Sequence, residues 1–90
     1  MPYTILCFDK ENKPNVRKIN RDEHLKYLKN FKKKLLVAGP ILDKSGLPTG
    51  SIIILNLDTI QEIKDFIRND PYYKAGLFKE TKILNFKKVF

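Results

Sequence analysis

The sequence has one cysteine, one histidine and no long apolar run, and each shortage excludes a class of protein. Cys7 has no second cysteine for an internal disulfide or a cysteine-cluster metal site. A single histidine offers too few ligands for the usual metal centre, and the sequence has no glycine-rich nucleotide loop of the Rossmann or Walker type, so we expect neither a metal nor a cofactor. No window approaches the roughly 18 apolar residues of a membrane-spanning helix. The first residues, 1–4, lack the pattern of a signal peptide, so we expect a cytoplasmic protein.

Length and charge narrow the possibilities further. Ninety residues, 42% of them apolar, suit one domain over residues 1–90. Lysine and arginine total 18 against 10 acidic residues, which gives a net charge of +8. Such a charge is compatible with binding of nucleic acid phosphates, or with a solvated lysine-rich surface that only favours solubility.

The first half of the chain reads as strand, helix and strand. Residues 3–8 form a β-rich apolar run, and residues 9–15 read as a loop. Asn20, with Glu23 three positions later, predicts a capped helix start. The apolar spacing of this helix includes positions 24, 28, 31 and 35, and we expect the helix to end near residues 31–33. Residues 34–42 then predict a strand.

The second half repeats this alternation. Residues 43–50 read as a turn-rich connection and residues 51–57 as an isoleucine-rich strand. Asp58 or Thr59 caps a second helix, which must stop at Asp70 because a proline follows. A short turn closed by Gly76 then leads to a last strand over residues 77–86.

The resulting β-α-β-β-α-β order predicts an α+β fold of the split βαβ type. Such a chain forms a four-stranded antiparallel sheet with both helices on one face. Right-handed crossovers fix the strand order as 4-1-3-2.

The expected strands are apolar on both faces. In residues 3–8 and 51–55, neither of the two alternating sets of side chains is mainly polar. Two short helices cover only one face of a sheet, so the other face needs a partner. We therefore predict a homodimer that packs sheet against sheet.

The topology brings His24 close to Asp70. The two long helices run antiparallel, so the start of the first lies at the same end of the domain as the finish of the second. Ser51, Arg17 and Arg21 belong to the same end, as does the end of the first strand at Asp9.

This group of residues suits proton chemistry on a small anion. A carboxylate that accepts one imidazole N–H fixes the tautomer and leaves the other nitrogen to take or give a proton. The arginines suit an anionic substrate. Ser51 acts as a nucleophile only if His24 lies within hydrogen-bonding reach.

Each of these residues also has a structural interpretation. Asp70 before a proline is a good cap for the following turn, and His24 on an apolar stripe suits a hydrogen-bonded core histidine. The two arginines suit a solvated surface, and Ser51 suits an ordinary strand.

Several short segments, in this order and spacing, resemble the YCII-related family of small dimeric α+β barrel proteins. The matching pieces are Arg17, residues 21–25, residues 38–40, Gly50-Ser51, and residues 70–72 with 75–77. The resemblance implies a ferredoxin-like fold, dimerisation through the sheet and a site containing His24 and Asp70, with Ser51 and Arg17 lining the same pocket. One branch of the family is similar to enzymes that eliminate chloride from chlorinated aromatic diols and triols. The chain departs from the family where its final strand has Asn85-Phe86 instead of Pro-Trp.

Three functions follow as hypotheses. The first is an enzyme in which His24 and Asp70 carry out general acid–base chemistry, of the elimination or isomerisation type, on a small polar or anionic substrate. The second is a ligand-binding or accessory protein without catalysis, which predicts the same pocket and dimer. The third is a nucleic-acid-binding module, which we disfavour because residues 51–57 carry no aromatic residue on which bases can stack.

Overall fold

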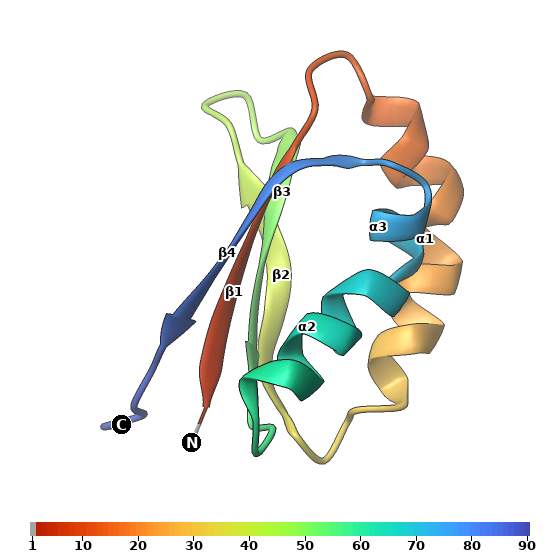
Figure 1. Cartoon of the computed structure of the whole chain (residues 1–90). Coiled ribbons are helices and arrows are strands. Elements are labelled where there is room, and N and C mark those ends of the chain that lie inside the picture. Colours follow the sequence, from red (N-terminus) through yellow and green to blue (C-terminus); the bar gives the residue numbers. More distant parts are fainter. Residues whose placement is uncertain (1) are drawn as a thin grey trace.

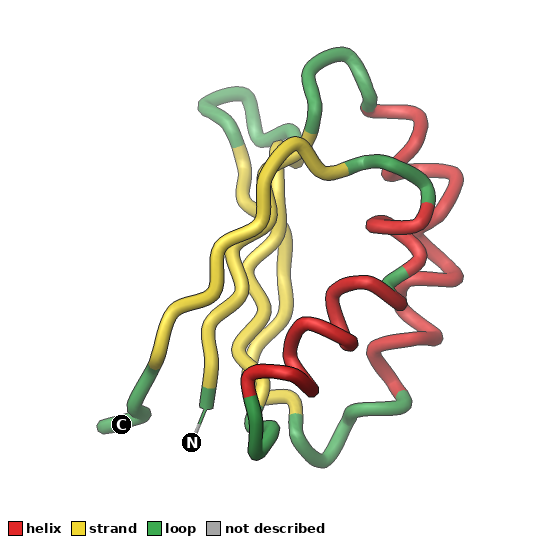
Figure 2. Tube along the Cα trace, in the orientation of Figure 1, coloured by secondary structure: helices red, strands yellow, loops and turns green. Residues whose placement is uncertain are grey.

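The computed structural model describes residues 2–90 and contains strands and helices in the expected order. Figures 1 and 2 show the sheet on one side and the helices on the other. The elements are β1 (Tyr3–Asp9), α1 (Pro14–Lys29), β2 (Leu35–Leu42), β3 (Pro48–Leu55), α2 (Ile60–Asn69), α3 (Pro71–Lys74) and β4 (Phe78–Asn85).

The four strands form one antiparallel sheet in the order β2-β3-β1-β4. This is the predicted order 4-1-3-2 read from the other edge. All three helices lie on the same face of the sheet (Figure 1). The predicted ferredoxin-like α+β fold is therefore confirmed.

Helix α1 begins seven residues earlier than predicted, because its cap is Lys13 instead of Asn20 and its first residue is Pro14. Proline is favoured in the first turn because it lacks the N–H that would be unsatisfied there and its φ is already helical. Asn20 is no cap, since its side-chain amide donates to the carbonyl oxygen of Val16 at 2.9 Å. The helix ends at Lys29, so the predicted end near residues 31–33 was also wrong. Leu35 lies in β2, outside the helical pattern to which it was assigned.

The connection between β2 and β3 is shorter than the predicted residues 43–50. Asp43 closes it, because its Oδ1 accepts the backbone N–H of Ser45 at 2.8 Å and that of Leu47 at 3.0 Å. Gly46 takes the positive φ of 84° that the turn requires. Strand β3 consequently starts at Pro48 and ends at Leu55, instead of spanning residues 51–57.

The second half of the helical layer follows its predicted boundaries. Thr59 caps α2, and its side chain accepts the N–H of Glu62 at 3.1 Å. The helix stops at Asn69, because Asp70 is extended at ψ 129° before Pro71. Asp70 then caps the short helix α3.

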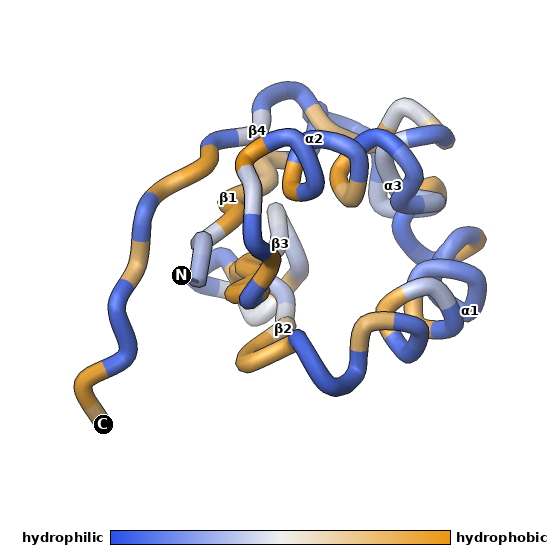
Figure 3. The backbone as a smooth tube through the Cα atoms, turned by 60° about the horizontal axis from the view of Figure 1, so that its bottom comes forward, coloured by the Kyte–Doolittle hydropathy of each residue, from blue (hydrophilic) through white to orange (hydrophobic). Residues whose placement is uncertain are grey.

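The core lies between the sheet and the helices. Its most buried members come from β1, β3 and α2 and include Ile5, Ile53, Leu55 and Ile63. Figure 3 shows hydrophobic stretches along these strands and a largely hydrophilic α1. No helix in residues 2–90 has the length and apolar character needed to cross a membrane.

The face of the sheet turned away from the helices, here called the open face, is also apolar. The register places on it Thr4, Leu6, Phe8, Val37, Ile41, Ile52, Ile54 and Leu84, with the charged Glu80 and Lys82 on the edge strand β4. Val37 is 51% exposed and Leu84 is 48% exposed. The expectation of two apolar faces is confirmed, and within residues 2–90 no helix lies over the second face.

Candidate active site

His24 and Asp70 meet in the interior, as predicted. The imidazole is on α1 and the carboxylate is at the junction of α2 and α3, and Nδ1 lies 2.8 Å from Oδ1 of Asp70. The residues are only 7% and 2% exposed. An ionised carboxylate accepts hydrogen bonds only, so Nδ1 is the protonated nitrogen. Within residues 2–90, Nε2 of His24 has no protein hydrogen-bond partner, and in the neutral ring it carries the free lone pair.

Tyr72 joins this pair from α3. Its backbone N–H donates to the same Oδ1 of Asp70 at 2.9 Å. Its ring stacks on the imidazole, with centroids 3.9 Å apart and an angle of 10° between the planes. One carboxylate oxygen therefore both holds His24 and caps the helix that carries the stacking ring, so the catalytic and structural interpretations of Asp70 are compatible.

Arg17 is held by a second carboxylate, the part-buried Asp9. Its Nε and Nη2 donate to the two oxygens of Asp9 at 2.8 Å each, which is the bidentate geometry of a strong ion pair. Nη2 also donates to Oγ of Ser51 at 3.1 Å. Burial lowers the pKa of Arg17, but the bonds to Asp9 outweigh it and raise the pKa above its ordinary value. Arg17 therefore stays charged, and its charge is already paired with that of Asp9.

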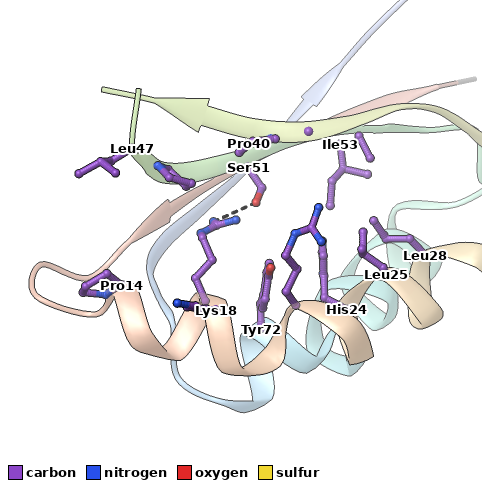
Figure 4. Close-up of a pocket in the computed structure, with 15 residues that line it drawn as sticks. Pro14, Lys18, His24, Leu25, Leu28, Pro40, Leu47, Ser51, Ile53 and Tyr72 are labelled. Atoms are coloured by element: carbon purple, nitrogen blue, oxygen red, sulfur yellow. Dashed lines mark hydrogen bonds between the residues drawn. The ribbon is translucent and has the colours of Figure 1, made fainter. Parts of the chain in front are cut away.

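A cavity of about 500 Å³ opens between α1 and strands β2 and β3 (Figure 4). Its walls include Arg17, Lys18, Arg21, His24, Ser51 and Tyr72 as polar residues. Leu25, Leu28 and Ile53 contribute to its apolar wall. The cavity is therefore basic in one part and apolar in another.

All five predicted site residues border or meet at this cavity. Arg17, Arg21, His24 and Ser51 line it, and Asp70 lies behind His24. Within residues 2–90 the side chain of Ser51 bonds Arg17 and not His24, so the condition for a nucleophilic serine is not met.

The sequence interpretation gave no role to two residues of the site. Asp9 was placed at this end of the domain, yet its ion pair with Arg17 was not foreseen. Tyr72 was only part of a matching segment, and the aspartate–proline pair before it was the one signal that a helix start would orient it. Among residues 2–90, no group of three or more histidine, cysteine or acidic side chains is arranged to hold a metal ion.

Comparison with known proteins identifies the family. A model of the YCII-related domain matches residues 1–87. The chain belongs to the YCII-related family. It is 36% identical to an uncharacterised protein of Haemophilus influenzae and 31% identical to protein YciI of Escherichia coli, with both chains covered completely in each case.

Solved structures share the fold of this YCII-related chain. The chain is similar to the 5-chloro-2-hydroxyhydroquinone dehydrochlorinase TftG of Burkholderia phenoliruptrix, solved in complex with 2,5-dihydroxybenzoquinone, at a TM-score of 0.91 and 35% identity. That match covers 97% of this chain and 94% of the other. An antibiotic biosynthesis monooxygenase matches at a TM-score of 0.57 and 10% identity over 99% of both chains, which shows the shared fold alone.

Proposed function

We propose that this YCII-related protein is an enzyme that uses His24 as a general base and acid on a small anionic substrate. The observation that carries the proposal is the 2.8 Å contact between Nδ1 of His24 and Asp70, which leaves Nε2 without a protein partner on a wall of the cavity. A fixed tautomer with a free nitrogen beside a ligand-sized space is the arrangement that proton transfer requires.

The reaction we propose is an elimination or an isomerisation. In the elimination, Nε2 takes a proton from the substrate, the freed electron pair forms a new double bond, and the leaving group departs as an anion with its own electron pair. Asp70 stabilises the imidazolium that forms. In the isomerisation, the imidazolium returns the proton to a different substrate atom.

Charge at the cavity supports an anionic substrate. Lys18 and Arg21 line it and form no ion pair with an acidic residue among residues 2–90, whereas Arg17 is already paired with Asp9. We therefore assign anion binding chiefly to Arg21 and Lys18. Arg17, which the sequence also assigned to substrate binding, can contact a substrate only through the N–H groups that do not already bond Asp9 or Ser51.

The similarity to TftG suggests the first compounds to test. Anaerobic assays of 5-chloro-2-hydroxyhydroquinone, read out as chloride release, should show turnover by the wild type that His24→Gln abolishes. Equal chloride release by His24→Gln and wild type would contradict the role of His24. Saturable binding of 2,5-dihydroxybenzoquinone without any turnover would favour the non-catalytic ligand-binding alternative.

We also propose that two copies associate through the open face. The support is a continuous apolar surface on β1, β2 and β3 that includes Val37 and Ile52, exposed by 51% and 36%. A second copy offers a self-complementary surface of the same character.

A further inference from the structure

The hydroxyl proton of Ser51 is free to donate a hydrogen bond. Oγ accepts the N–H of Arg17 at 3.1 Å, and Arg17 is itself fixed by Asp9. A hydroxyl has one proton and two lone pairs, so a serine whose oxygen already accepts a hydrogen bond still has its proton to donate. Ser51 is 4% exposed and lines the cavity, which directs that proton towards a bound ligand rather than to bulk water.

The hydroxyl of Tyr72 lies in the same region. In Figure 4 the Tyr72 ring stands between α1 and the sheet, with its oxygen directed towards the strand that carries Ser51. The residue is 2% exposed and lines the cavity. Arg17 lies close enough to donate to this hydroxyl, and an oxygen that accepts from Arg17 still has its own proton to donate, as in Ser51. Burial raises the pKa of Tyr72 against the opposing effect of Arg17 and Arg21, so the phenol stays protonated at neutral pH and is a donor.

We propose that the hydroxyls of Ser51 and Tyr72 form a donor pair that binds an anionic oxygen carried by an sp² carbon of the substrate, such as a phenolate or an enolate. The proposal rests on the proposed function, because it assigns the ligand group that these residues hold while His24 moves the proton. Tyr72 stacks on His24 at 3.9 Å, so a group bound at its hydroxyl lies beside the imidazole.

Electrostatics favour such an oxygen here. The guanidinium of Arg17 bonds Ser51 and lies 4.8 Å from the centroid of the Tyr72 ring, so its positive charge polarises both hydroxyls. Fixed donors with positive charge behind them stabilise developing negative charge without reorganisation. The competing interpretation is that the Tyr72 ring only supports His24 by stacking and its hydroxyl contacts water. Removal of the hydroxyl alone distinguishes the two.

The experiment uses 4-nitrophenolate, whose absorbance reports hydrogen bonding to its oxygen, at a pH at which it is ionised. Nitrobenzene is the comparator without the oxyanion. Tyr72→Phe keeps the stacking ring, and Ser51→Ala keeps a small strand residue. Tyr73→Phe and Ser45→Ala are matched controls, because Tyr73 is 43% exposed on α3 and Ser45 lies in the exposed hairpin turn, and neither lines the cavity.

We expect the wild type to bind 4-nitrophenolate saturably, with a shifted absorbance maximum. Tyr72→Phe and Ser51→Ala should each weaken binding about tenfold, as expected for loss of one hydrogen bond to a charged acceptor. The two controls should bind like the wild type. Unchanged binding in both Tyr72→Phe and Ser51→Ala, no saturable binding to the wild type, or equally tight binding of nitrobenzene would each overturn the donor pair.

These outcomes are separable from a failure of the proposed function. Binding of the probe requires no proton transfer, so Tyr72→Phe and Ser51→Ala report on the donor pair whether or not the protein turns over a substrate. If turnover proves independent of His24, the donor pair is still measured by the probe. If the donor pair fails, chloride release that depends on His24 still stands.

Discussion

The ring of Tyr72 lies flat against the imidazole of His24, with 3.9 Å between centroids and 10° between planes. The backbone N–H of the same tyrosine donates to Asp70 Oδ1, which also accepts Nδ1–H of His24. The three residues are thus one unit, in which a single carboxylate oxygen sets the tautomer of the base and the start of the helix that supports it.

Replacing Asp70 should therefore affect both stability and tautomer. Asp70→Ala removes a helix cap and leaves buried Nδ1–H without an acceptor, so the free energy of unfolding should fall by about 2 to 4 kcal/mol. Urea denaturation measures this, with Asp58→Ala at an exposed position as the control.

Asp70→Asn keeps the shape but offers an amide donor as well as an acceptor to the imidazole. We expect the population of the Nε2–H tautomer to rise, which ¹⁵N chemical shifts of the single histidine report directly. The same tautomer population in wild type and Asp70→Asn would contradict the claim that Asp70 selects it.

The meeting of His24 and Asp70 was predictable because topology alone decides it. Antiparallel helices over one sheet bring the start of one next to the end of the other, whatever the precise boundaries. The Asp9–Arg17 pair was not predictable in this way. With the helix start placed at Asn20, Arg17 belonged to a loop, whereas the start at Pro14 puts Arg17, Arg21 and His24 on successive turns of one helical face.

Local energetics explain why helix α1 starts at Pro14 and not after the capping pattern at Asn20. A capping box at Asn20 contributes about 1 kcal/mol, whereas the seven additional helical residues 14–20 bring their own hydrogen bonds and the part-buried Arg17 ion pair. The Tyr72 stack depends on side-chain packing between α1 and α3, which neither periodicity nor spacing encodes.

The Asp9–Arg17 ion pair should contribute measurably to stability. Both side chains are 11% exposed, so Asp9→Asn leaves a buried guanidinium without its counter-charge. We expect the free energy of unfolding to fall by about 2 to 3 kcal/mol. The matched control is Glu80→Gln in the exposed Lys82–Glu80 pair at 3.5 Å, which should change stability by less than about 0.5 kcal/mol. Similar losses in both variants would show that Asp9 acts as an ordinary surface charge.

Cys7 should be an unreactive thiol whose burial makes stability depend on alkaline pH. Burial, followed by the charge of Asp70, raises the pKa of Cys7 from 9.0 to about 12. Between these values the folded chain keeps the thiol proton and the unfolded chain releases it, so stability is fully present below pH 9 and falls as pH rises.

The slope from this group should be about 1.4 kcal/mol per pH unit above pH 9. Urea denaturation of the wild type and Cys7→Ala from pH 8.5 to 10.5 isolates the contribution of the thiol, because all other titrating groups are present in both proteins. The stability difference between the two proteins should shrink as pH rises. A difference independent of pH would mean that the thiol ionises as readily in the folded chain, in which case a disulfide reagent should also label it without denaturant.

The net charge of +8 should give only weak, non-specific attraction to nucleic acid. The open face presents aliphatic side chains on β3, with Phe8 as the aromatic contribution of β1, so stacking of successive bases has no platform. Fluorescence anisotropy with a random oligonucleotide should show binding at low salt that vanishes near physiological ionic strength. Tight binding that persists there, in both wild type and His24→Ala, would favour a nucleic-acid-binding function over the enzyme.

Self-association through the open face gives the last prediction. Ile52 lies in β3 between Leu6 of β1 and Gly39 of β2, so a charge placed there enters the middle of the apolar surface. Light scattering coupled to size exclusion should show a dimer for the wild type and a monomer for Ile52→Lys, because two buried lysines without partners oppose association by several kcal/mol. Ile60→Lys is the matched control, since Ile60 is 43% exposed on α2 and lies outside the open face. If the wild type is monomeric at micromolar concentration, or if Ile52→Lys remains dimeric with the wild-type dissociation constant, the two copies do not meet through this face.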